Sequence, residues 1–275
     1  MVTFGSSTYL WLYAPERLMI ALSPTVRRLA LIGSVLALLS AIVWLALEAA
    51  SMADDWSAAL DPGAIGAVLT DTAFGHAWAA HLALAAALAA VVVFGPRARW
   101  AATAVASAAL LASLGLVGHA AMQTGAEGVL HRMNHAVHLL TAGAWVGGLF
   151  PFVMCVNRSR GHHLRSEAVT AMMRFSFYGH FVVATLVLTG AANIALTSER
   201  LPIPPDSPYR ALLDAKIVIV AVMIVLAIVN RYALVPRLKT SVNALGEMRV
   251  LSLINVALGT VVVALVSVFA LLDPA

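Results

Sequence analysis

Three histidines stand at the start of one apolar segment, Leu130 to Leu149. At about 100° of rotation per residue, the side chains of His131, His135 and His138 fall within roughly 60° of one another on a helix, in a stripe about 10 Å long. An imidazole that faces lipid tails loses its hydration and gains no partner, so we expect the stripe to face a neighbouring helix or a wet cavity. His119 ends the preceding apolar segment, only a short loop away, and we expect it at the same end of the protein.

These imidazoles suit copper, zinc or haem iron, since neutral imidazole binds all three. The nearby thioether of Met122 favours Cu(I), which accepts soft sulfur ligands, whereas Met133 lies about 160° from the middle of the stripe.

Two alternatives to a copper or zinc site stay open. Haem b could bind between His119 and either His135 or His138, because axial ligands often come from two facing helices. The histidines could also be interfacial groups, hydrogen-bonded to one another or to water, without a metal.

His76 and His81 are weaker candidates, because a spacing of five residues spreads them over about 140° of a helix. An anchoring role at the membrane interface explains them equally well. His81 lies one turn deeper and is the better candidate ligand.

A second set of soft donors follows towards the other end of the histidine segment and beyond it. These residues could receive a copper ion that leaves the membrane, although methionine and cysteine in apolar helices most often serve packing. Between the two ends, paired glycines permit either close helix contact or local unwinding beside a path. The donors are Met154, Cys155, Met172, Met173 and His180, and the glycines are Gly147 and Gly148.

Composition defines the elements that must position these side chains. With 61% apolar residues, 11% charged residues and a mean hydropathy of +0.92, the chain is typical of an all-α polytopic membrane protein. The single cysteine excludes an internal disulfide and a cysteine-rich metal site. No nucleophile motif, phosphate-binding loop or pair of catalytic carboxylates stands within the spans, which favours a transport protein over an enzyme. A membrane oxidoreductase is the alternative.

Hydropathy predicts one membrane domain, residues 1–275, with about eight spans. Residues 1–14 are too short to cross a bilayer, which takes about 20 helical residues. We therefore expect them to be the inner part of a longer first span, with the native start upstream, or to be only partly inserted. The remaining spans are expected at about 27–50, 76–94, 100–119, 130–156, 174–197, 211–229 and 250–272.

Loop charges predict the orientation, because Lys and Arg concentrate in cytoplasmic loops. Thirteen of the 17 basic residues fall in one set of alternate loops and most acids fall in the other. This pattern places both termini and the histidine cluster on the outer, periplasmic side. In a membrane protein the formal charge of +4 reports this topology, so nucleic acid is not an expected partner. The basic residues are Arg17, Arg27, Arg28, Arg97, Arg99, Arg158, Arg160, Arg165, Arg174, Arg231, Arg237, Lys239 and Arg249.

Several segments, taken together and in order, resemble the copper resistance protein D (CopD) family of bacterial inner-membrane proteins. They are GHA at 118–120, HRMNHAVHLLTAGAWVGGL at 131–149, MRFSFYGHF at 173–181, LTGAAN at 188–193, Lys216 early in its span, and NRYALVPRL at 230–238. The resemblance covers nearly the whole chain, and the combination is more specific than any one motif.

The resemblance implies eight spans, copper movement from periplasm to cytoplasm, and pairing with a periplasmic CopC-type copper-binding protein. It supports His119, His131, His135 and His138 as outer ligands and His180 as a residue near the inner side, and it says less about His76 and His81. The family's first span normally starts further upstream. Membrane lipids are the expected environment, and a homo-oligomer is compatible with the sequence.

Overall fold

The computed structural model describes residues 1–95, 100–118, 125–161, 163–198, 204, 207–237 and 243–269. Throughout these residues the regular structure is helical, which confirms the all-α class. Six helices are long and apolar enough to cross a membrane, and residues 100–116 form a shorter apolar helical segment. In chain order the helices are α1 (Val2–Leu12), α2 (Glu16–Ala53), η1 (Trp56–Leu60), α3 (Pro62–Asp71), α4 (Ala73–Phe94), α5 (Trp100–Ser113), η2 (Leu114–Leu116), α6 (Gly125–Arg158), α7 (Arg165–Ser198), α8 (Pro208–Ile228), η4 (Val229–Leu234), α9 (Val235–Arg237) and α10 (Ala244–Phe269).

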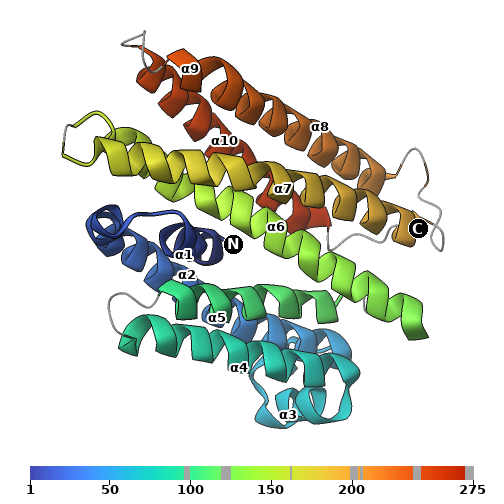
Figure 1. The fold of residues 1–275 in the computed structure, drawn as a ribbon. Coiled ribbons are helices and arrows are strands. Elements are labelled where there is room, and N and C mark those ends of the chain that lie inside the picture. Colours follow the sequence, from blue (N-terminus) through green and yellow to red (C-terminus); the bar gives the residue numbers. More distant parts are fainter. Residues whose placement is uncertain are drawn as a thin grey trace.

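The helices form three layers (Figure 1). Helices α2, α4 and α5 make one outer layer, α6 and α7 pack together in the middle, and α8 with α10 makes the other outer layer. The short α1 is buried between α2, α5 and α6. The largest apolar core joins α1, α2, α5, α6, α7, α8 and α10, and it includes Tyr9, Trp145, Phe175 and Met223.

Two ends of this bundle are used as reference points below. The basic end holds the α6–α7 and α9–α10 connections, with Arg158, Arg165 and Arg237. The histidine end holds the start of α6, the end of α7 and the start of α8.

Several helix boundaries differ from the sequence prediction. The second span begins at Glu16 instead of near Arg27, because the helix continues through Pro24. The predicted basic loop before the sixth span is largely helical, since α6 continues to Arg158 and α7 begins at Arg165. Hydropathy alone misplaces such ends, because amphipathic helical turns project beyond the apolar core of a membrane.

The acidic segment between α2 and α4, predicted as a loop, contains η1 and α3. Local capping explains both. The Asp55 carboxylate accepts from the Ser57 backbone N–H, and the Asp61 carboxylate accepts from the Gly63 N–H, with Pro62 at the first helical position.

Helix α1 lies against the middle of α6, and glycines make this close approach. A Cβ atom on Gly5 would collide with the backbone of Gly143 and Gly147, and the Ser6 hydroxyl donates to the Gly147 carbonyl at 3.0 Å. A Cβ atom on Gly148 would meet the Phe175 ring of α7. Of the two alternatives for the paired glycines, the structure therefore shows close contact, within an uninterrupted α6.

Candidate metal site

The histidine stripe lies on a continuous helix, as the spacing predicts, because α6 runs unbroken through His131, His135 and His138. His131 is buried, and the other two are half-buried against α7. His119 and Met122 lie outside the described residues. Within the described part of the chain, no group of three His, Cys, Asp or Glu side chains is placed to hold a metal ion. The structure therefore does not gather His131, His135 and His138 around one point, and the four-histidine site stays a prediction.

The ring of His138 is anchored by Thr189 of α7. The His138 Nδ1 atom lies 3.1 Å from the Thr189 hydroxyl oxygen, and that hydroxyl donates its proton to the Thr185 carbonyl at 2.7 Å. The Leu186 carbonyl lies 3.2 Å from the same hydroxyl oxygen and is a second backbone acceptor beside the ring. Because its neighbours here are acceptors, Nδ1 carries the proton and donates to Thr189. The lone pair is then on Nε2, which is how a metal-ligating histidine is commonly prepared.

His135 is held by an asparagine pair that bridges α6 and α7. Asn134 donates from Nδ2 to the Asn193 side-chain oxygen at 2.8 Å and to the Thr189 carbonyl at 2.9 Å. The amide nitrogen of Asn193 is thereby directed to His135, with Nδ2 and Nδ1 3.5 Å apart. His135 thus accepts at Nδ1, through a long contact that a metal ion could replace.

Lys216 of α8 completes the polar surroundings. Its ammonium group lies near enough to His138 to interact with it electrostatically, and His135 interacts with the same ring. Asp214 stands two residues before Lys216 on α8 and forms an exposed ion pair with Arg210 at 3.1 Å. Asp214 thus has an ion-pair partner on its own helix, whereas Lys216 lies within electrostatic reach of His138.

His81 of α4 is also held through Nδ1 by a hydroxyl group, on the other side of α6. Its Nδ1 lies 2.7 Å from the Ser113 hydroxyl oxygen, and Ser113 donates to the Leu110 carbonyl at 2.7 Å. Nδ1 of His81 is again the donor, which leaves the Nε2 lone pair. The ring is buried and stacked on Trp78 with centroids 4.6 Å apart. His76 is exposed and contacts the Thr70 carbonyl, in keeping with an interfacial role.

The predicted set of soft donors at the basic end is divided among different surroundings. Cys155 is fully buried and accepts a hydrogen bond from the Tyr9 hydroxyl at 3.3 Å. Met173 is exposed and contacts the Arg231 guanidinium at 3.2 Å, and His180 contacts the Tyr232 hydroxyl at 3.0 Å. Met172 is buried beside a cavity.

Sequence reasoning missed two members of the outer network. Asn134 stands on the same stripe as the histidines, four residues before His138, and Thr189 stands four residues before Asn193 on α7. The i, i+4 spacing on each helix was the available signal. Which residues would face each other across the two helices could not be read from it.

Two family models match the chain: "Copper resistance protein D-like, N-terminal domain" over residues 1–129 and "Copper resistance protein D" over residues 169–269. The chain is 34% identical over 276 residues to the inner membrane protein YebZ of Escherichia coli K12, covering 100% of this chain and 94% of that protein. It is 28% identical over 226 residues to copper resistance protein D of Pseudomonas syringae pv. tomato, covering 80% and 72% of the two chains.

A third relative, the copper transport protein CutJ of Bacillus subtilis 168, is 28% identical over 172 residues, or 59% of this chain and 31% of that protein. No solved structure matches the chain. The end-to-end match to YebZ spans the histidine helix, and together with the two family models it shows that this chain belongs to the copper resistance protein D family of membrane proteins.

Proposed function

We propose that this protein moves copper across the bacterial inner membrane. Copper would bind at the histidine end and leave at the basic end, which we place in the periplasm and the cytoplasm respectively. The observation that carries the proposal is the anchored His138 ring, whose Nδ1–H donates to Thr189 and whose Nε2 lone pair is left for a metal. The names of two relatives, a copper resistance protein and a copper transport protein, agree with it.

The ligand set of the proposed entry site combines His138 and His135 with His131, His119 and Met122. Imidazole nitrogen together with a thioether favours Cu(I). Lys216 beside this site disfavours an extra positive charge, so copper bound there is expected to exchange and not to remain as a resident cofactor. The onward path would follow α6 towards the basic end.

The direct test is Cu(I) entry into liposomes that contain the purified protein and an entrapped Cu(I) indicator. We expect His138→Ala to lose most of the uptake and His135→Ala to lose a large part of it. His76→Ala is the matched control, because His76 is an exposed histidine on α4 with only a surface contact described. Wild-type uptake by a correctly inserted His138→Ala protein would overturn the proposal.

A b-type haem protein is the second candidate, in which the Nε2 atom of His138 would be one axial ligand. The optical spectrum of the purified protein separates the two functions. A Soret band that disappears in His138→Ala would make this a redox protein.

We also propose that a periplasmic CopC-type protein supplies the copper. Transfer from a loaded CopC-type protein to the reconstituted wild type, but not to His138→Ala, would support that partner.

A further inference from the structure

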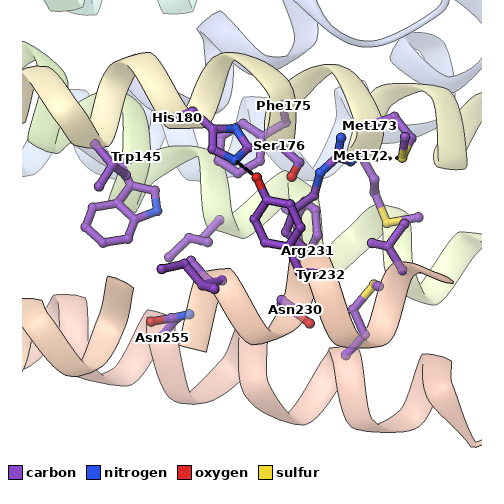
Figure 2. A pocket seen from close by; sticks show the side chains of 18 of the residues that line it. Trp145, Met172, Met173, Phe175, Ser176, His180, Asn230, Arg231, Tyr232 and Asn255 are labelled. Carbon is purple, nitrogen blue, oxygen red and sulfur yellow. Dashed lines mark hydrogen bonds between the residues drawn. The ribbon is translucent and has the colours of Figure 1, made fainter. Parts of the chain in front are cut away.

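A cavity of about 630 Å³ lies between α6, α7, α8 and α10 in the half of the bundle nearer the basic end. Its walls are mostly apolar and include Trp145, Phe152 and Phe175. Figure 2 shows Asn230 and Asn255 on the wall that faces α7, and protein encloses the side-chain oxygen of each. The volume is typical of a site for an organic molecule. The proposed copper entry site shares none of the lining residues.

The cavity opens on the lipid-facing side of the bundle. Tyr232 is 63% exposed and Ile228 is 51% exposed, and both lie in a segment apolar enough to span the membrane. A ligand therefore enters from the bilayer. The apolar walls favour a hydrocarbon chain, because they offer it close contacts and bring no polar group that would have to be desolvated.

Two arginines line the same cavity from two different elements, Arg165 as the first residue of α7 and Arg231 in η4. Arg165 stands about two helical turns before Met173, towards the basic end. Figure 2 shows Arg231 beside Met173, on the side of the cavity away from Trp145. Positive charge thus lies at one end of the cavity, and the apolar walls continue from there towards Trp145.

These two guanidinium groups have free hydrogen-bonding capacity. Arg231 donates to the Met173 sulfur at 3.2 Å, but a thioether is a weak acceptor and a guanidinium has five N–H donors. In the described part of the chain, neither Arg165 nor Arg231 has a carboxylate within salt-bridge distance. Glu167, close to Arg165 in the sequence, accepts from the Ser166 hydroxyl instead, at 2.8 Å. Since none of the described lining residues is acidic, the cavity favours an anion that enters from outside.

The wall that carries Arg231 is a π-helical turn, η4, which continues α8. Arg231 and Tyr232 follow each other in this turn and contact two different residues of α7, Met173 and His180. Turns of this kind within α-helices are frequent at functional sites. The turn thus presents a cation and a phenol to one cavity.

A copper ion does not suit this cavity, although two soft donors line it. The sulfur of Met173 lies against the Arg231 guanidinium, whose charge repels a metal cation. His180 donates from Nδ1 to the Phe177 carbonyl at 3.1 Å, so its Nε2 accepts the Tyr232 hydroxyl proton at 3.0 Å. Both donors are therefore engaged, and the available charge selects an anion.

We infer that this cavity binds an anionic phospholipid from the leaflet at the basic end, with its phosphate at Arg165 and Arg231 and one acyl chain along the apolar walls. Arginine forms paired N–H bonds to phosphate, and basic pockets between membrane helices are suited to anionic headgroups. A zwitterionic lipid binds more weakly, because its ammonium group is repelled by the arginines. This binding site goes beyond the proposed copper transport and does not depend on it.

The headgroup is tested with the intact protein, delipidated in detergent, and native mass spectrometry that counts bound lipid during a titration. The probes are phosphatidylglycerol and phosphatidylcholine with the same acyl chains. We expect one phosphatidylglycerol to bind about tenfold more tightly than phosphatidylcholine. Arg231→Gln should lose most of this preference. Arg28→Gln is the matched control, because Arg28 is an exposed arginine of α2 outside the cavity, and it should keep the preference.

The acyl chain is tested with a variant that fills the cavity. Gly179 lines the cavity and a Cβ atom there meets nothing within 4 Å, so Gly179→Leu adds bulk without a clash at the Cβ position. It should weaken the binding of both lipids several-fold and keep the preference for phosphatidylglycerol. Gly246→Leu is the control, because a Cβ atom on Gly246 also meets nothing within 4 Å and Gly246 does not line the cavity.

Equal binding of the two lipids by the wild type, or an unchanged preference in Arg231→Gln, would overturn the inference. Undiminished binding by Gly179→Leu would also overturn it, since the lipid would then lie on the outer surface. Glycerol 3-phosphate, which carries the phosphate without an acyl chain, should not displace phosphatidylglycerol at equal concentration. Displacement would show that the site takes a free phosphate compound and not a lipid.

Discussion

His138 of α6 donates from Nδ1 to the hydroxyl oxygen of Thr189 on α7, across 3.1 Å, while Thr189 donates its own proton to the backbone one turn earlier. Two helices separated by a basic connection in the sequence therefore set the tautomer of one imidazole. The same arrangement recurs between His81 of α4 and Ser113 of α5. Both rings are held at Nδ1, so their ligand capacity resides on Nε2.

Thr189→Val is expected to weaken Cu(I) binding by about tenfold or more, because valine keeps the shape of threonine but cannot orient His138. Competition with a coloured Cu(I) chelator measures the affinity. Thr260→Val is the control, since the Thr260 hydroxyl contacts only the Val256 carbonyl of its own helix in the described contacts. Unchanged affinity in Thr189→Val would mean that the Thr189 contact does not prepare His138 for copper.

Gly147→Ala is expected to lower the free energy of unfolding by about 1–3 kcal/mol, because a Cβ atom there overpacks the α1–α6 contact. Thermal unfolding in detergent reports the change. Gly246→Ala is the comparison, since a Cβ atom on Gly246 meets nothing within 4 Å and alanine favours a helix. Equal melting temperatures for the two variants would contradict the close packing of α1.

Cys155 is expected to resist N-ethylmaleimide in the native protein and to react after denaturation in SDS. Its thiol is fully buried and accepts from the Tyr9 hydroxyl, so neither a reagent nor an exiting metal ion reaches it. A Gly161→Cys, Cys155→Ser protein provides the positive control, because position 161 is exposed. Rapid native labelling of Cys155 would return it to the list of exit ligands.

Orientation can be tested with single cysteines in a Cys155→Ser background and a membrane-impermeant maleimide on spheroplasts. Ser57→Cys, in the acidic segment between α2 and α4, is expected to react in intact spheroplasts. Gly161→Cys, in the basic α6–α7 connection, should react only after lysis. The reverse pattern would invert the membrane topology and the proposed direction of transport.

The sequence alone determined the class of this protein. Long apolar segments with few charges can satisfy their backbone hydrogen bonds in lipid only as helices, so an all-α membrane bundle followed from composition and hydropathy. The histidine stripe on α6 followed from helical periodicity, which is local. Helix ends were less well predicted, because turns outside the apolar core, such as Glu16 to Val26 and Arg165 to Phe175, carry little hydropathy signal.

Only the tertiary structure decided which residues meet across helices. Periodicity places Asn134 and His138 on one face of α6, but it does not say that Asn193 and Thr189 of α7 lie opposite them. It also does not show that Asn230 and Asn255, both isolated polar residues in apolar spans, share one cavity. Such pairings depend on the register and crossing of whole helices, which many weak packing contacts set together and no single segment of sequence encodes.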